Sequence, residues 1–186
     1  MKKYIALLTL AVISTSPLAD DLKQRADASR ATVMEFGKTL KGKMQQAMKA
    51  GGPLNAIGVC NADAPGIAAD MSNKKGWEVG RTSLKVRSAS NAPDAWETKV
   101  LNDFEKRKAE GANPKKLEHY EVVSENGKKM FRYMKAIPTG KVCTNCHGQN
   151  IDPAVNAKLK ELYPDDKATG FKVGDIRGAF AITQPM

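Results

Sequence analysis

A five-residue motif near the C-terminal end constrains this chain more than any other feature. Residues 143–147 read C-x-x-C-H, with Cys143, Cys146 and His147 at the fixed positions. Two thiols three positions apart can each bond one vinyl group of a haem, and the imidazole that follows then lies beneath the iron, so the motif is typical of c-type haem attachment. We expect one covalent haem c, held by Cys143 and Cys146, with His147 as the proximal iron ligand. A disulfide between the two cysteines is the alternative interpretation.

Strand signals directly before the motif restrict the fold. Residues 119–124 and 128–137 have strand character and flank an Asn-Gly pair at 126–127, which is the strongest short signal for a β-hairpin. A hairpin at this place argues against a four-helix cytochrome, although such bundles do carry the motif near their end. The commonest small cytochromes use a methionine well after the motif as the sixth iron ligand. Here the downstream methionine is the terminal Met186, so that architecture is not expected.

A long amphipathic helix is predicted on the N-terminal side, over residues 20–52. Its apolar and small residues recur mostly at alternating steps of four and three: Leu22, Ala26, Ser29, Val33, Phe36, Leu40, Met44 and Ala47. It should end at Gly51-Gly52-Pro53, because glycine and proline terminate helices. Two interpretations stay open: the helix packs on its own domain, or it forms a coiled-coil homodimer.

The remaining segments carry both helix and strand signals. Further helices are predicted over 54–71, 95–109 and 153–162, and further strands over 77–83 and 178–183. Asp94 supplies an N-cap for the helix that begins at residue 95. Gly58, Pro65 and Gly66 should break or kink the helix over 54–71. This order of elements indicates an α+β domain with an antiparallel sheet.

The first nineteen residues predict a secretory signal peptide. Two lysines precede an apolar run over residues 5–13, and Ala19 is a small residue before the cleavage point. A run of about ten residues is too short for a membrane span, which needs roughly 20. We therefore expect cleavage, a periplasmic location and a single domain over residues 20–186 without a membrane span. Cleavage lowers the formal charge from +10 to +8, and that charge is spread along the chain, so no nucleic-acid partner is expected.

One cysteine stays unassigned after haem attachment. Cys60 is the third of three cysteines, and a leftover thiol is unusual in an oxidising compartment. It is a buried inert thiol, half of an intermolecular disulfide, or a thiolate ligand of the iron opposite His147. The other histidine, His119, has mixed strand neighbours and is expected at the surface. Met130 and Met134 share one strand face and are expected in the core.

Several segments together carry a family resemblance. They are residues 56–60 and 64–68, the Gly-Arg-Thr-Ser strand at 80–83, residues 87–97 with Asn91, Pro93, Asp94 and Trp96, and the C-x-x-C-H motif. They resemble a bacterial c-type haem domain of PAS-like fold, found alone or as the periplasmic sensing part of kinases and chemoreceptors. After Arg87 the chain has Ser-Ala-Ser, where the family usually has an Asn-Pro step.

The resemblance implies a fold and a ligand set. The fold is a PAS-like antiparallel sheet with a long N-terminal helix and a C-terminal haem-attachment loop. The implied axial ligands are His147 and Cys60. The family also places Arg81 and Arg87 near the haem, where a guanidinium can pair with a propionate.

Two functions agree with these features. The first is a monohaem periplasmic cytochrome that passes one electron to or from a redox partner protein. The second is a haem-based sensor of redox state or of a gas such as nitric oxide or carbon monoxide, which signals through a separate partner. An enzyme is not expected, because a peroxidase or oxidase needs an open sixth iron position with acid–base groups above it.

Overall fold

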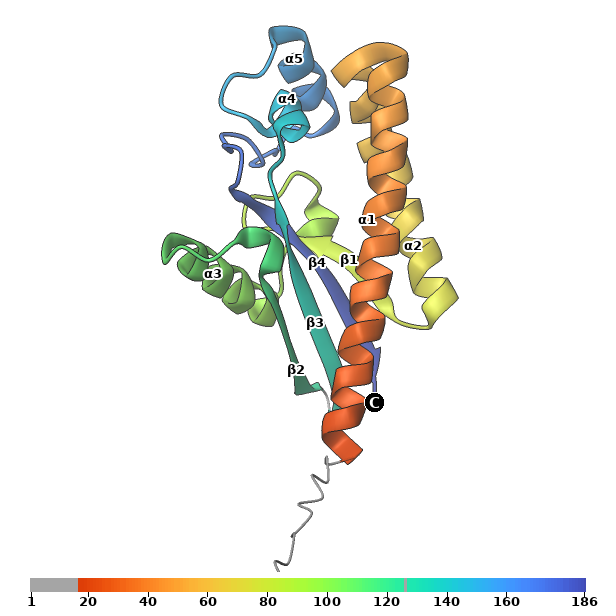
Figure 1. Cartoon of the computed structure of the whole chain (residues 1–186). Helices are drawn as coiled ribbons and strands as arrows, with labels where there is room; N and C mark the ends of the chain where they lie inside the picture. Colours follow the sequence, from red (N-terminus) through yellow and green to blue (C-terminus); the bar gives the residue numbers. More distant parts are fainter. Residues whose placement is uncertain (1–16, 126) are drawn as a thin grey trace, which may run out of the picture.

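The computed structural model describes residues 17–125 and 127–186. Its helices are α1 (Pro17–Gly58), α2 (Ala64–Lys75), α3 (Ala95–Ala109), α4 (Thr144–His147) and α5 (Pro153–Leu162), and its strands are β1 (Glu78–Thr82), β2 (Glu118–Glu125), β3 (Lys128–Pro138) and β4 (Ile176–Pro185). A π-helical turn, η1 (Val59–Asp63), joins α1 to α2. The four strands form one antiparallel sheet in the order β1-β4-β3-β2 (Figure 1). The predicted α+β class with an antiparallel sheet is confirmed.

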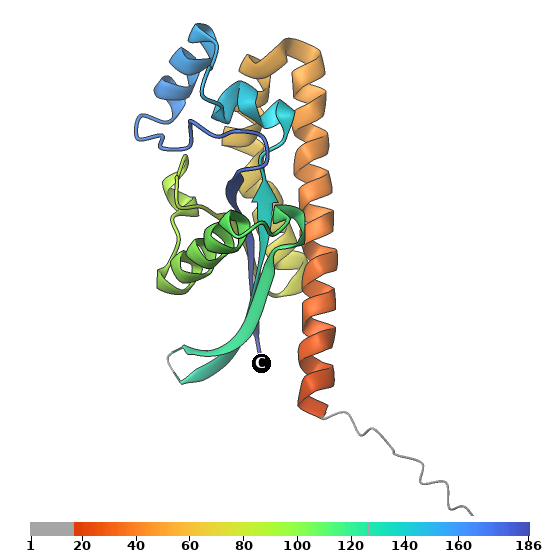
Figure 2. The same cartoon turned by 60° about the vertical axis from the view of Figure 1, so that its left-hand side comes forward.

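Helices cover both faces of this sheet (Figure 2). The core under α1 and α2 contains Ala26, Val33, Phe36, Ile67, Met71, Val79, Phe131, Tyr133 and Ile182. The core under α3 contains Val100, Leu101, Phe104, Leu117, Met134, Ala136, Ile176 and Ala179. Side chains alternate between the two faces along β3, as the period of two in a strand requires. The predicted core position is correct for Met134, whose side chain is fully buried, and wrong for Met130, which is only half-buried.

The face of α1 that the sequence marks as apolar packs on the sheet of its own chain. Ala26, Ser29 and Phe36 are completely buried there. The helix begins at Pro17, three residues before the predicted start, and its C-terminal part extends past the sheet toward α4 and α5 (Figure 1). The interpretation of a helix packed on its own domain is therefore correct, and the homodimer stays a prediction.

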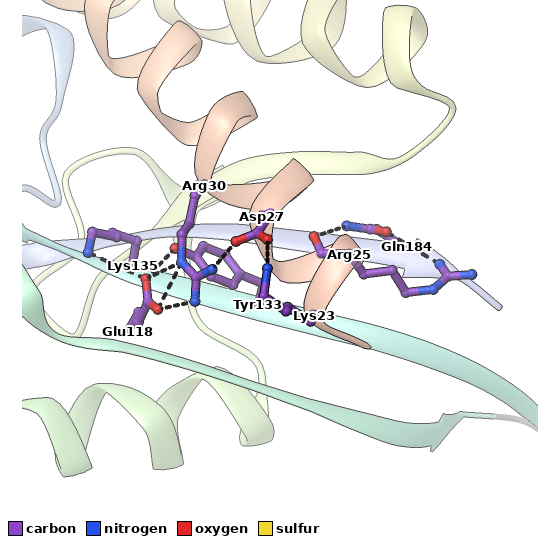
Figure 3. A network of polar contacts seen from close by, with 8 residues as sticks. All are labelled: Lys23, Arg25, Asp27, Arg30, Glu118, Tyr133, Lys135 and Gln184. Atoms are coloured by element: carbon purple, nitrogen blue, oxygen red, sulfur yellow. Dashed lines mark hydrogen bonds and ion pairs between the residues drawn. The ribbon is translucent and has the colours of Figure 1, made fainter. Parts of the chain in front are cut away.

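A polar network ties the N-terminal half of α1 to the sheet (Figure 3). The Arg30 Nε donates to both carboxylate oxygens of Glu118, at 3.0 and 3.1 Å. The Tyr133 hydroxyl donates to the same carboxylate at 2.9 Å. The hydrogen bonds from Arg30 are the largest influence on the pKa of Glu118, which lies below its ordinary value. This half of the helix is thus fixed to β2 and β3 by polar as well as apolar contacts.

The chain reverses direction at the predicted Gly-Gly-Pro stop. Gly52 has φ of +69°, outside the helical range, and after this kink the last part of α1, residues 53–58, runs back beside the part that precedes the kink. The break expected around Pro65 takes the form of the π-helical turn η1, in which the Ala64 amide bonds to the Val59 carbonyl. A proline has no N–H and its ring crowds the preceding turn, so an extra residue is accommodated there. The helix then continues to Lys75, beyond the predicted end at residue 71.

Local sequence signals placed α3 and the hairpin correctly. Asp94 accepts a hydrogen bond from the Glu97 amide, and the Glu97 carboxylate accepts one from the Asp94 amide, which completes a capping box. The hairpin strands pair in register up to Glu125 and Lys128, whereas the predicted Asn-Gly turn includes residue 126, which lies outside the described residues. The strands predicted over 77–83 and 178–183 correspond to β1 and β4.

The end of the sheet supports a small helical cap. The register of β3 and β4 shifts between Ile137 and Pro138, where the missing proline N–H interrupts the ladder. Beyond this point lie α4, α5 and the segment 163–175. A cluster of Ile57, Val155, Leu159 and Tyr163 packs α5 against the helix that leads into η1. This cap brings the C-x-x-C-H motif next to Cys60.

The signal-peptide prediction falls mainly on residues 1–16, which lie outside the described residues. Residues 17–19 belong to the first turn of α1. In the ranges 17–125 and 127–186, no helix combines the length and the apolar character that a membrane crossing requires.

Candidate functional site

One cavity of about 520 Å³ lies between the C-terminal part of α1, η1, the end of the sheet and α4. Its lining includes all six candidate residues: Cys60, Arg81, Arg87, Cys143, Cys146 and His147. Four different segments contribute these side chains. A cavity of this volume is in the usual range for small-molecule and cofactor sites. Apolar side chains of α1 and β4, among them Leu40 and Phe180, form part of its wall.

The attachment motif begins at Cys143, the last residue of a 3-10 turn, and continues through the short helix α4 at one side of the cavity. Cys143 and Cys146 are both free thiols, so the alternative disulfide is not formed in this structure. Burial raises the pKa of the Cys146 thiol. The helical turn places both thiols on the cavity wall together with the His147 imidazole.

The His147 ring is held by the segment that follows α5. Its Nδ1 lies 2.7 Å from the Ala168 carbonyl oxygen and 3.2 Å from the Arg177 Nε. One nitrogen cannot donate to Ala168 and accept from Arg177 together, and the shorter contact assigns the proton to Nδ1. Burial and the charges of Arg177 and Arg87 hold the pKa of His147 well below its ordinary value. The ring is therefore neutral, and its Nε2 lone pair lies 3.5 Å from the Arg87 Nη1, a contact that a metal bound at Nε2 would replace.

Cys60 approaches the cavity from the π-helical turn η1. Such turns are rare and frequently occur at functional sites. Burial raises the pKa of the Cys60 thiol, and the positive charges of Arg81, Arg87 and Arg177 oppose that rise. A thiolate at this position would thus face a cationic wall.

Arg81 supplies a half-buried positive charge that has no acidic partner among the described residues. None of the described Asp and Glu side chains forms an ion pair with it, and its guanidinium lies over the Phe36 ring at 5.8 Å. Burial lowers the pKa of Arg81, and Cys60 is the largest influence that opposes this shift. A cation that has lost part of its contact with water is stabilised by a compensating anion, so this wall of the cavity suits a negatively charged group.

Arg87 connects the attachment segment, residues 143–147, to the segment that follows α5. Its Nη2 donates to the Cys146 carbonyl oxygen at 2.6 Å and lies 2.8 Å from Asp166 Oδ2, and both charged side chains are 9% exposed. A weaker contact of 3.3 Å reaches the Ala168 carbonyl. Arg87 therefore joins the motif to the segment that holds His147. Its carboxylate partner Asp166 was not foreseen, because it lies far away in the sequence.

Arg177 is a site residue that the sequence analysis missed. It lines the cavity, and its Nη1 donates to the Ser83 hydroxyl at 2.9 Å and to the Lys85 carbonyl at 3.2 Å. Burial, with the neighbouring charges of Arg87 and Arg81, lowers its pKa to about 10. The residue after it, Gly178, lies where a Cβ would meet the Thr82 carbonyl oxygen at 2.3 Å. Gly178 is therefore required where β4 passes close to β1. In the sequence, this glycine is the one sign of that close approach.

The donor set fits a large planar group better than a single metal ion. In the described part of the chain, no three His, Cys, Asp or Glu side chains converge on a point where a metal ion could sit. The cysteines and His147 are instead spread around one cavity whose arginines can pair with carboxylates. These features fit a haem with its two vinyl groups, its iron and its propionates. His119 lies elsewhere, at the surface against Glu121 and Trp96, as predicted.

Comparison with known proteins agrees with the fold and the site. The family model described as Tll0287-like matches residues 17–185. The crystal structure of the cyanobacterial haem protein Tll0287 matches with a TM-score of 0.63 and 26% identity, and the match covers 86% of this chain and 96% of that one. None of the curated proteins compared with the chain matches it. The chain belongs to the Tll0287-like family.

Proposed function

We propose that this chain is a periplasmic monohaem c-type cytochrome that carries one electron. Cys143 and Cys146 hold the haem through thioethers, and His147 and Cys60 are its axial ligands. The observation that carries the proposal is the single cavity in which the motif, Cys60 and the arginines meet. The likeness to a structure described as a haem protein supports the same assignment.

The chain prepares His147 for ligation before any metal is bound. The Ala168 carbonyl accepts a hydrogen bond from the Nδ1–H group. This contact fixes the tautomer, orients the ring and makes Nε2 a stronger electron-pair donor to a metal. Arg87 fixes the peptide of Cys146 next to it. When bound, the haem supplies a one-electron ferric/ferrous couple.

Cys60 sets the electronic character of the site. A thiolate donates charge to ferric iron and favours it over ferrous iron, which lowers the reduction potential. Arg81 and Arg177 are the guanidinium groups best placed for the propionates, because neither has an Asp or Glu ion-pair partner among the described residues. Arg87, the other residue expected in this role, is already paired with Asp166.

An electron carrier agrees with the cavity lining better than an enzyme. The described residues that line the cavity include no Asp or Glu, and His147 is the one imidazole among them. An oxygen- or peroxide-activating site would need an acid–base group above the iron. The predicted signal peptide supports export to the periplasm, where an acceptor or donor protein would exchange the electron.

Denaturing mass spectrometry of the mature protein, with its pyridine haemochrome spectrum, tests the attachment. We expect the polypeptide mass plus one haem. Cys143→Ala and Cys146→Ala should each leave one free vinyl group and shift the haemochrome band, whereas Cys60→Ala should keep both thioethers. A bare polypeptide with a Cys143–Cys146 disulfide after expression with haem c maturation would refute the assignment.

The second candidate function is a redox or gas sensor. The observation that favours it is the position of Cys60 in η1, between two helices that pack on the sheet. Dissociation of Cys60 from the iron would therefore change the conformation of the turn that joins α1 to α2. Hydrogen exchange of the ferric, ferrous and nitric oxide-bound protein distinguishes the two functions. A sensor should change exchange along α1, whereas a carrier should show the same pattern in all three states.

A further inference from the structure

A methionine of α1 shares the cavity with Cys60. Met44 and Met48 both line it, although the sequence analysis treated Met44 only as part of the apolar stripe. A thioether is a known axial ligand of haem iron in cytochromes c. The inference below rests on the proposed haem site and adds a second sulfur ligand to it.

Two contacts between the part of α1 before the kink and the returning segment place Met44 at the level of Cys60. Lys43 Nζ lies 3.5 Å from Asp63 Oδ2, and Asn55 Nδ2 donates to the Ala47 carbonyl at 3.4 Å. Met44 falls between Lys43 and Ala47 on α1, and Cys60 falls between Asn55 and Asp63 on the returning helix. Met44 and Cys60 are therefore opposite each other across the helix pair, and both face the cavity. Met48 lies one turn, about 6 Å, closer to the kink.

The two sulfur ligands suit different charges on the iron. A thiolate is an anion and stabilises ferric iron, whereas a thioether is neutral and soft and suits the less charged ferrous iron. Methionine has three rotatable side-chain bonds, so its sulfur can adapt to a new position without movement of the backbone. The half-buried Met44 side chain sits in a largely apolar wall formed with Leu40 and Ile57.

We propose that Met44 is the sixth ligand of the ferrous iron, and that it replaces Cys60 when the haem is reduced. The iron accepts one electron from a one-electron donor, a redox protein in the cell or dithionite in the assay. The iron–sulfur bond to Cys60 breaks, and the sulfur keeps its electron pair as a thiolate beside Arg81. The Met44 sulfur then donates a lone pair to the iron, and no bond within methionine breaks.

The polypeptide around Cys60 can accommodate this exchange. The π-helical turn η1 interrupts the regular helical hydrogen-bond pattern at Cys60 itself. The non-helical backbone at Gly51 and Gly52 separates the last part of α1, which leads into η1, from the long part before the kink. Cys60 can therefore move away from the iron while the N-terminal half of α1 stays fixed by the Arg30–Glu118 network.

Absorption and proton NMR spectra of the ferric and ferrous states test the exchange in wild type, Met44→Leu and Met48→Leu. Met34→Leu is the matched control, because Met34 lies on the same helix but is 74% exposed and outside the cavity lining. We expect all four ferric spectra to agree, which also reports correct folding. Ferrous wild type should be low-spin, with the methyl resonance of a ligating methionine shifted far upfield.

The ferrous Met44→Leu protein should lose that resonance, become high-spin and bind carbon monoxide with an apparent affinity about tenfold higher or more, because no methionine sulfur competes for the sixth position. Met48→Leu and Met34→Leu should match wild type. A ferrous Met44→Leu spectrum identical to wild type overturns the proposal, and so does a change confined to Met48→Leu. A ferric wild-type spectrum without a thiolate signature contradicts the Cys60 assignment instead, and the covalent attachment is reported separately by the denatured mass.

Discussion

Substitution of Arg87 by methionine should destabilise the protein strongly. The substitution keeps much of the side-chain volume but leaves the Asp166 carboxylate, 9% exposed, without its cation. Breaking a buried ion pair by removal of one partner costs about 3–5 kcal/mol. Asp166 still accepts a hydrogen bond of 2.7 Å from the Ala168 amide. We therefore expect a loss at the lower end of this energy range. A loss of about 3 kcal/mol lowers the Tm of a domain of this size by about 6–12 °C.

Equilibrium urea unfolding of the haem-loaded protein measures this loss. Asp166→Asn removes the buried charge, so the double variant should be less destabilised than the two single changes added together. Arg107→Met is the control, because its pair with Asp103 is an exposed pair one helical turn apart, with side chains 38% and 48% exposed. It should change the free energy of unfolding by about 0.5 kcal/mol or less. If Arg87→Met is no more destabilising than Arg107→Met, Arg87 does not hold the attachment segment in place.

Two further substitutions test the contacts that hold α1 and β4. Glu118→Gln should cost about 1 kcal/mol at neutral pH, because it removes the charge that pairs with Arg30. The folded pKa of Glu118 is lowered, so its contribution is complete above the unfolded pKa of about 4.3 and is lost as the pH falls through the folded value. Urea titrations at several pH values should show the gap to wild type closing in acid, and a gap that is independent of pH contradicts this account. Gly178→Ala should cost about 2 kcal/mol or more, since the added Cβ meets the Thr82 carbonyl oxygen at 2.3 Å. Gly80→Ala, with no atom within 4 Å of the added Cβ, is its control, and equal Tm values for the two variants would exclude a steric role for Gly178.

Elements governed by neighbouring residues could be predicted from the sequence. The Asp94 cap, the Asn-Gly turn and the Gly-Gly-Pro stop each act within a few residues, and α3, the hairpin and the kink appear where they were expected. The apolar stripe of α1 likewise identified the face that packs on the sheet. The break expected at Pro65 was only partly right, because a π-helical turn absorbs the proline and the helix continues.

The missed site residues depend on contacts between distant segments. Arg177 enters the cavity because β4 passes close beside β1 at Gly178, and nothing near Arg177 in the sequence marks that approach. The partner of Arg87 is Asp166, from a segment with no regular structure. Met44 looked like one more apolar helix position until the returning helix placed it opposite Cys60. Sequence patterns identified the chemistry of the motif, whereas the groups that surround it required the tertiary fold.

The electron paramagnetic resonance spectrum of the ferric mature protein, recorded beside Cys60→Ala, tests the proposed haem site most directly. We expect a low-spin signal with thiolate character in wild type, which disappears in Cys60→Ala while the covalent haem remains. A wild-type signal typical of histidine and methionine ligation, or a high-spin signal, that Cys60→Ala leaves unchanged would contradict it and make Cys60 a structural thiol.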